Sequence, residues 1–150
     1  MNVEHYLNPL KESFEALADT GNARQMKAYM KDQFEFYGLK APVRREIQKE
    51  FLAQYGKPDK QLLVPLIKEL WGRPEREWQM FAMDILDKSQ KHWNDDVMSL
   101  FEFLITTKSW WDTVDFMAAT LVYKHYSKNA ARDEALIRRW SQSNNMWLNR

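Results

Sequence analysis

The sequence predicts an all-α protein, a HEAT-like α-solenoid of stacked antiparallel helix pairs. Its 150 residues contain only 4 glycines and 5 prolines, so few breaks are available for short strands joined by turns. These breaks fall between stretches whose apolar residues recur with helical spacing. Pro42, Pro58 and Pro74 recur every 16 residues, each shortly after a glycine. Regular breaks of this kind predict a series of short helices.

Each glycine and proline pair is expected to end one helix and begin the next. Glycine adopts the left-handed conformation just past a helix end, and proline suits the first helical turn. Two such units form a hairpin of about 32 residues, close to the repeat length of helical solenoids. A chain of this length predicts a single domain over residues 1–150. In chain order, the expected helices are Val3–Ala18, Ala23–Phe34, Pro42–Tyr55, Lys60–Leu70, Pro74–Ser89, Trp93–Thr106, Trp110–Ser127 and Arg132–Gln142.

Composition excludes several kinds of chemistry. The chain has no cysteine, which rules out disulfides, thiolate zinc sites and a cysteine nucleophile. His5, His92 and His125 lack metal-ligand spacing, and no glycine-rich phosphate loop occurs, so we expect neither a metal nor a cofactor. No stretch approaches the roughly 20 apolar residues of a membrane span, and the N-terminus lacks a signal-peptide core. We therefore expect a cytoplasmic protein that does not bind membranes.

Charge leaves the question of nucleic-acid binding open. The net charge is +1, but contact with phosphates needs only a local basic face. Two basic pairs, Arg44 with Arg45 and Arg138 with Arg139, lie at ends of expected helices. Solvated surface is the default interpretation of such pairs, and phosphate contact is the alternative.

The segment 108–115, KSWWDTVD, is the most informative part of the chain. Ser109 with Asp112 resembles a capping box, which would begin a helix here. The core stripe of that helix would then be formed by Trp110, Val114, Met117 and Leu121.

Trp111 and Asp115 are four residues apart and are expected to share a neighbouring face of this helix. An aromatic plane and a carboxylate would then point into the same space. Spacing alone also allows a structural role for each residue. Asp115 could pair with an arginine or a backbone amide of the next helix, and Trp111 could fill space between helices.

Two further segments carry candidate contact residues. Tyr29 lies among Met26, Met30 and Phe34 on a helix that could face the same groove as Trp111 and Asp115, on a concave surface of the solenoid. The segment 143–150, SNNMWLNR, is expected to be a loop that opens a further helix, with side-chain amides and the Arg150 guanidinium suited to contact with phosphates. A simple capped turn is the alternative interpretation of this segment.

Together these motifs identify a resemblance to the bacterial DNA alkylation repair family, the AlkD-type HEAT-like DNA glycosylases. The resemblance covers about Ala23 to Arg150. It rests on the Tyr29 segment, on GLKAPVRR at 38–45, on LWGRPEREWQMFAMD at 70–84, and most of all on KSWWDTVD and SNNMWLNR. Several ordered motifs in one chain are far more specific than a single motif.

The resemblance implies a monomer that binds alkylated double-stranded DNA on a concave face and acts in base excision repair. In this family, positively charged N3- or N7-alkylated purines lose their glycosidic bond without being flipped into a pocket. Trp111 and Asp115 match the family's essential aromatic residue and carboxylate. Tyr29 matches an aromatic groove residue and Arg150 a phosphate-contacting arginine. We add Trp147, Arg44 and Arg45 as candidate DNA contacts.

The family pattern continues for several helices beyond SNNMWLNR, so we expect this chain to lack the family's C-terminal helices, which contain a second groove tryptophan. The alternative function is a noncatalytic HEAT-like module that binds DNA or a protein, because helical solenoids commonly serve as scaffolds.

Overall fold

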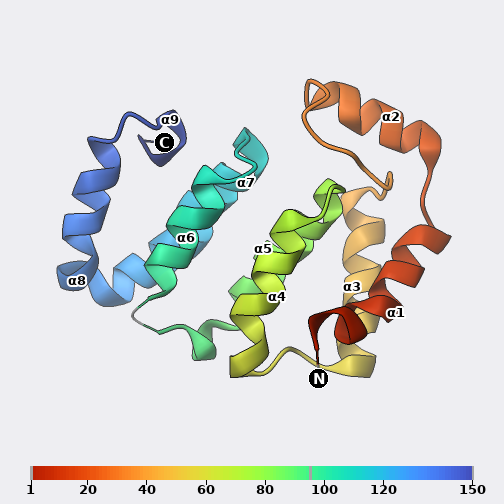
Figure 1. Ribbon diagram of the computed structural model, residues 1–150, viewed down its shortest axis with the longest axis horizontal. Coiled ribbons are helices and arrows are strands. Elements are labelled where there is room, and N and C mark those ends of the chain that lie inside the picture. Colours follow the sequence, from red (N-terminus) through yellow and green to blue (C-terminus); the bar gives the residue numbers. More distant parts are fainter. Residues whose placement is uncertain (1, 95, 150) are drawn as a thin grey trace. The chain divides into compact units, whose positions relative to one another are not determined.

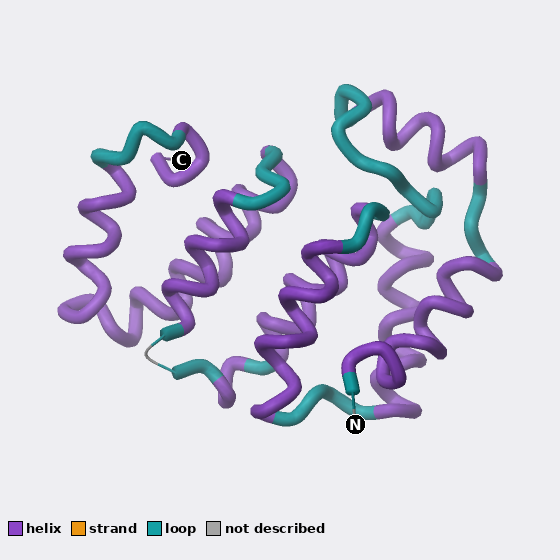
Figure 2. Tube along the Cα trace, viewed as in Figure 1, coloured by secondary structure: helices purple, strands orange, loops and turns teal. Residues whose placement is uncertain are grey.

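The computed structural model describes residues 2–94 and 96–149, and the side chains of all of these except 131 and 132. This part of the chain is helical, and the isolated bridge between Glu35 and Glu75 is its only strand-like pairing (Figure 2). The predicted all-α, solenoid-like class is thereby confirmed. None of the described helices is long and apolar enough to cross a bilayer.

Contacts divide the chain into two compact units, Met1–Ala82 and Met83–Arg150. The expectation of a single domain stays a prediction. The first unit contains α1 (Val3–Ala16), α2 (Thr20–Tyr29), α3 (Ala41–Tyr55), α4 (Lys60–Gly72) and the start of α5 (Arg76–Lys88), all labelled in Figure 1.

The first unit has a core of large apolar side chains. Helix α1 packs against α3 and α4. Fully or almost fully buried side chains between these helices and α5 include Leu10, Phe14, Leu66, Ile67, Leu70, Trp71, Trp78 and Phe81. Burying a side chain of this size stabilises a fold by about 1.5–3 kcal/mol. Helix α2 differs, because it contains no buried residue.

Capping residues define several helix ends of the first unit. The side chains of Asn2, Asp19 and Asp59 accept hydrogen bonds from amides in the first turns of α1, α2 and α4. Gly56 ends α3 with a φ of +79° and a ψ of 171°, a conformation that is open to glycine but differs from the expected left-handed one. Gly72, by contrast, is still part of α4. The glycine and proline rule locates these breaks to within a few residues, but Pro9 and Pro65 lie inside α1 and α4 and mark no break.

A buried carboxylate holds the loop between α2 and α3. Glu77, near the start of α5, is 2% exposed. Its side chain accepts hydrogen bonds from the backbone amides of Tyr37, Gly38 and Leu39, at 3.0, 3.0 and 3.1 Å. A carboxylate with three such donors satisfies polar groups that the core would otherwise leave unpaired.

Replacing Glu77 by alanine is therefore expected to lower the free energy of unfolding by about 3 kcal/mol or more, because three amides lose their acceptor. Urea denaturation measures this loss. Glu46 is an exposed carboxylate of α3, and its replacement by alanine should cost less than about 0.5 kcal/mol. Equal stability of the two variants would contradict the role of Glu77 in holding the loop through these three amides.

Ionisation of the Tyr6 hydroxyl is expected to destabilise the fold at high pH. Its hydroxyl donates a hydrogen bond to the Gly56 carbonyl at 2.6 Å, and burial raises the pKa of Tyr6 to about 12. The unfolded chain ionises this group at a pKa of about 10, so the stabilisation is complete below pH 10 and is lost as pH rises towards 12. Urea denaturation at a series of alkaline pH values should show this decline, and Tyr6→Phe should make it shallower. An unchanged slope in Tyr6→Phe would assign the decline to other groups, such as Tyr37, whose pKa burial raises to about 12.

The second unit contains the remainder of α5, a short 3-10 turn at Gln90–His92, α6 (Val97–Thr106), α7 (Trp111–Phe116), η2 (Met117–Val122), α8 (Tyr123–Ser141) and α9 (Met146–Asn149). Segment η2 is a π-helical turn between α7 and α8. Helix α6 contacts both η2 and α9, and α8 also contacts α9.

The helices expected at Trp110–Ser127 and Arg132–Gln142 form one helical run with a bend. Backbone angles at Asn129 leave the helical range, with φ −137° and ψ 35°. The Asn129 side-chain amide donates to the His125 carbonyl at 3.0 Å, and the buried His125 ring lies 2.6 Å from the Asp133 carboxylate. Side chains one turn before and one turn after the bend thus bridge it.

Candidate functional site

The loop before α7 positions the Trp111 and Asp115 segment. Lys108 adopts the left-handed conformation with a φ of +54°, and Trp110 is extended, so α7 begins at Trp111. The predicted capping box is wrong. Ser109 donates its hydroxyl hydrogen to the Ile105 carbonyl at the end of α6, and Asp112 accepts a hydrogen bond from the next amide, that of Thr113, at 2.8 Å. The serine completes the preceding helix because its hydroxyl finds an unpaired carbonyl there.

One side of α7 and η2 faces the core. Thr113, Val114, Met117 and Leu121 are fully buried, which confirms the predicted stripe at its last three positions. Trp110, the first position of that stripe, is only half-buried, and its indole nitrogen is buried without a hydrogen-bond partner among the described residues.

Trp111 and Asp115 lie on the other side of α7 and reach solvent. Trp111 is 39% exposed, and Asp115 is also exposed. Residues four apart on a helix are neighbours on its surface, so an indole and a carboxylate share one solvent-facing patch. Core filling, the structural interpretation of Trp111, does not account for a tryptophan with this exposure.

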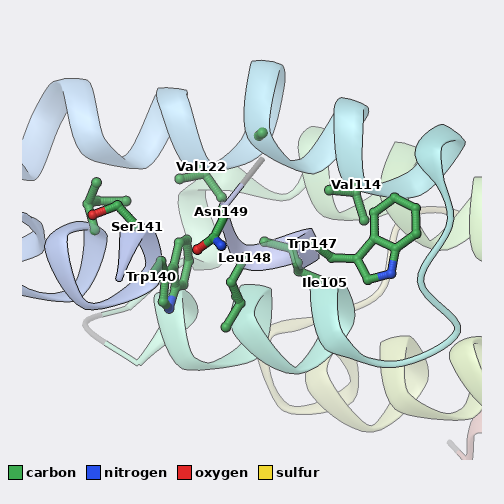
Figure 3. Close-up of a pocket in the computed structure, with 10 residues that line it drawn as sticks. Ile105, Val114, Val122, Trp140, Ser141, Trp147, Leu148 and Asn149 are labelled. Atoms are coloured by element: carbon green, nitrogen blue, oxygen red, sulfur yellow. The ribbon is translucent and has the colours of Figure 1, made fainter. Parts of the chain in front are cut away.

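Trp147 lies at an apolar pocket of the second unit. The expected further helix is present as the short α9, and it begins with a cap: the side chain of Asn145 accepts hydrogen bonds from the amides of Trp147 and Leu148 at 2.9 and 3.3 Å. Figure 3 shows Trp147 beside Val114 and, farther along the pocket, Trp140. The pocket has a volume of about 180 Å³ and a mostly apolar lining from α6, α7, η2, α8 and α9. Arg150 lies outside the described residues.

Three predicted contact residues belong to the first unit. Tyr29, the last residue of α2, is 72% exposed, and Arg45 in α3 is exposed. Arg44 is 7% exposed, and its guanidinium donates to the Gln48 side chain at 2.6 Å. Tyr29 and Arg45 can therefore reach a ligand of the first unit, whereas Arg44 is engaged inside it. A common concave face for these residues and Trp111 stays a prediction.

The second basic pair behaves as solvated surface. Arg138 pairs with Glu134 at 2.6 Å, and Arg139 lies 3.5 Å from Glu102, which also accepts from the Trp140 indole. Among the described residues, no cluster of three histidine or acidic side chains could hold a metal ion.

The π-helical turn η2 was not predicted from the sequence. No glycine, proline or charged residue marks the segment MAATLV, and its apolar spacing is compatible with an ordinary helix. A π-helical turn inserts about one extra residue and changes which later side chains share a face with Trp111 and Asp115.

Comparisons with known proteins agree on one family. The family model described as DNA alkylation repair enzyme matches residues 10–150. No curated protein gives a match. A solved structure described as a predicted DNA alkylation repair enzyme from Enterococcus faecalis is similar, with a TM-score of 0.75 and 25% sequence identity. The alignment covers 87% of this chain and 61% of that one, so the chain spans less than two thirds of that protein's length. Because the family model covers nearly the whole sequence, the chain belongs to the DNA alkylation repair enzyme family.

Proposed function

We propose that the chain is a DNA glycosylase that hydrolyses the N-glycosidic bond of cationic N3- or N7-alkylated purines in duplex DNA. The observation that carries the proposal is the exposed pair of Trp111 and Asp115 on one face of α7, in a chain of this family. An exposed tryptophan beside an exposed carboxylate gives a DNA-facing surface a contact for a cationic base and a fixed negative charge.

The proposed reaction needs little more than electrostatic stabilisation. An alkylated purine is already a cation, so the bond between C1′ and the purine nitrogen can break with its electron pair moving to the base. Positive charge then develops on the deoxyribose, and the Asp115 carboxylate stabilises that charge. A water molecule forms the new C1′–O bond and releases a proton to Asp115 or to solvent. The products are a neutral alkylpurine and an abasic site.

Trp111 has a separate role in the proposal. The negative face of an indole attracts a cation, by about 0.5–1 kcal/mol at exposed sites and more when water is excluded. Trp111 would therefore contact the cationic lesion and the sugar, while Tyr29, Arg45, Trp147 and Arg150 would contribute contacts to the DNA. A neutral purine gains nothing from the indole face and leaves as an anion, which gives selectivity for charged lesions.

The spectrum of released bases tests this proposal. Duplex DNA treated with a methylating agent contains cationic 3-methyladenine and 7-methylguanine together with neutral O6-methylguanine. We expect the chain to release the two cationic bases and to leave the neutral one in place. A noncatalytic binding module would release none of them, and release of all three alike would contradict selection by charge.

A further inference from the structure

Tyr123, the first residue of α8, is a large aromatic side chain left on the surface. It is 64% exposed, more than any other aromatic residue described in the second unit. Neither the core nor the pocket at Trp147 uses it. It lies eight residues after Asp115 along the same helical run, and the π-helical turn η2 separates the two.

The π-helical turn brings Tyr123 onto the face of Asp115. In a regular α-helix, a residue eight positions later points about 80° away around the axis. A π-helical turn adds about one residue to a turn, which reduces the offset to about 20°. The two side chains then lie almost in line along the helix.

Burial along the run independently supports this register. Each residue from 111 to 119 has the same degree of burial as the residue eight positions later. Val114 and Met117 are buried, and so are their counterparts Val122 and His125. Asp115 is exposed, and so is Tyr123. An eight-residue repeat of burial is what a helix containing one π-helical turn presents to a flat core.

The exposed face is also open between its two ends. Ala119 lies midway between Asp115 and Tyr123 and is itself exposed. Its methyl group leaves room for a DNA strand to run along this face of the helix. Eight residues span about 12 Å of helix axis, which corresponds to three or four nucleotides at about 3.4 Å each.

We propose that Tyr123 is a DNA-contacting residue whose hydroxyl donates a hydrogen bond to a backbone phosphate three or four nucleotides from the lesion. This inference rests on the proposed function, because the lesion at Trp111 and Asp115 defines the starting point. A tyrosine hydroxyl is a common donor to phosphate oxygens and carries no sequence preference. The contact would fix the register of the strand along the helix face.

The test uses the whole chain and a labelled duplex with one tetrahydrofuran abasic analogue, which cannot be hydrolysed and fixes the register. In a series of such duplexes, one phosphate at a time is replaced by an uncharged methylphosphonate. We expect the parent to lose affinity at a position three or four nucleotides from the analogue. Tyr123→Phe should bind the unmodified duplex about fivefold more weakly, since it lacks one hydrogen bond, and should lose nothing further at that position. Tyr55→Phe, a change in an exposed tyrosine of α3, is the matched control and should bind like the parent.

The outcomes separate this inference from the proposed function. If Tyr123→Phe keeps the parent's affinity and its sensitivity to each phosphate while the parent still releases alkylpurines, the inference alone is wrong. If the parent shows the Tyr123 effect but releases no base, the DNA contact stands and the glycosylase assignment is wrong. Failure of the parent to bind any of the duplexes would overturn both.

Discussion

Asp115→Asn is expected to lower the single-turnover rate of 7-methylguanine release by about 100- to 1000-fold, the usual effect of removing one group that stabilises transition-state charge. The carboxylate and the amide have nearly the same shape, and Asp115 is exposed, so the fold of α7 should not change. Only the negative charge is lost. Because that charge acts on the positive sugar of the transition state, affinity for the DNA should change little.

Asp112→Asn is the matched control for this prediction. Asp112 lies three residues before Asp115 on α7, and its carboxylate accepts a hydrogen bond from the Thr113 amide, which an asparagine oxygen can replace. We expect excision by Asp112→Asn to stay within a few-fold of the parent. Equal excision rates for the parent and Asp115→Asn would remove Asp115 from the mechanism.

Gly38→Ala is expected to have the largest effect on stability, a loss of more than about 4 kcal/mol, which would unfold the first unit. Gly38 has a φ of +94°, and a Cβ atom added there would lie 2.0 Å from the Asp19 carbonyl oxygen and 2.7 Å from the Ala23 amide nitrogen. Both neighbours are backbone atoms at the start of α2, so neither can move aside alone. The clash would separate the loop from the helix that carries Tyr29.

Gly56→Ala isolates the steric part of this effect. Gly56 also has a positive φ, of +79°, but an added Cβ would meet nothing within 4 Å. With its ψ of 171°, Gly56→Ala should therefore cost only the conformational penalty of this backbone region, about 1–3 kcal/mol. Thermal unfolding of the two variants measures the difference, and similar losses would show that conformation, not the clash, dominates at Gly38.

Local patterns predicted the helices well because helix formation depends on periodicity and on capping residues. Six of the eight expected helices begin or end within a few residues of the observed helices, and the last two are joined into one helical run across the bend at Asn129. The spacing of Trp111 and Asp115 also predicted that they share a neighbouring face of one helix. Their exposure to solvent is seen only in the structure.

Features that depend on contacts between distant parts of the chain could not be predicted from the sequence. In the sequence, Glu77 is an ordinary acidic residue in the first turn of a helix. Only the fold brings the amides of residues 37–39 to its carboxylate. The burial of Arg44 likewise depends on how α3 packs, since Arg45 beside it is exposed. One local prediction also failed, because Ser109 has the residue type of an N-cap but donates its hydroxyl hydrogen to the Ile105 carbonyl, four residues earlier in the preceding helix.

The glycosylase assignment is tested most directly by incubating an excess of the parent chain with a duplex that carries a single 7-methylguanine. We expect free 7-methylguanine and an abasic site to appear together in a single exponential phase, while an undamaged duplex of the same sequence stays intact. If the chain binds the damaged duplex and the lesion remains in place, the chain is a binding module and not a glycosylase.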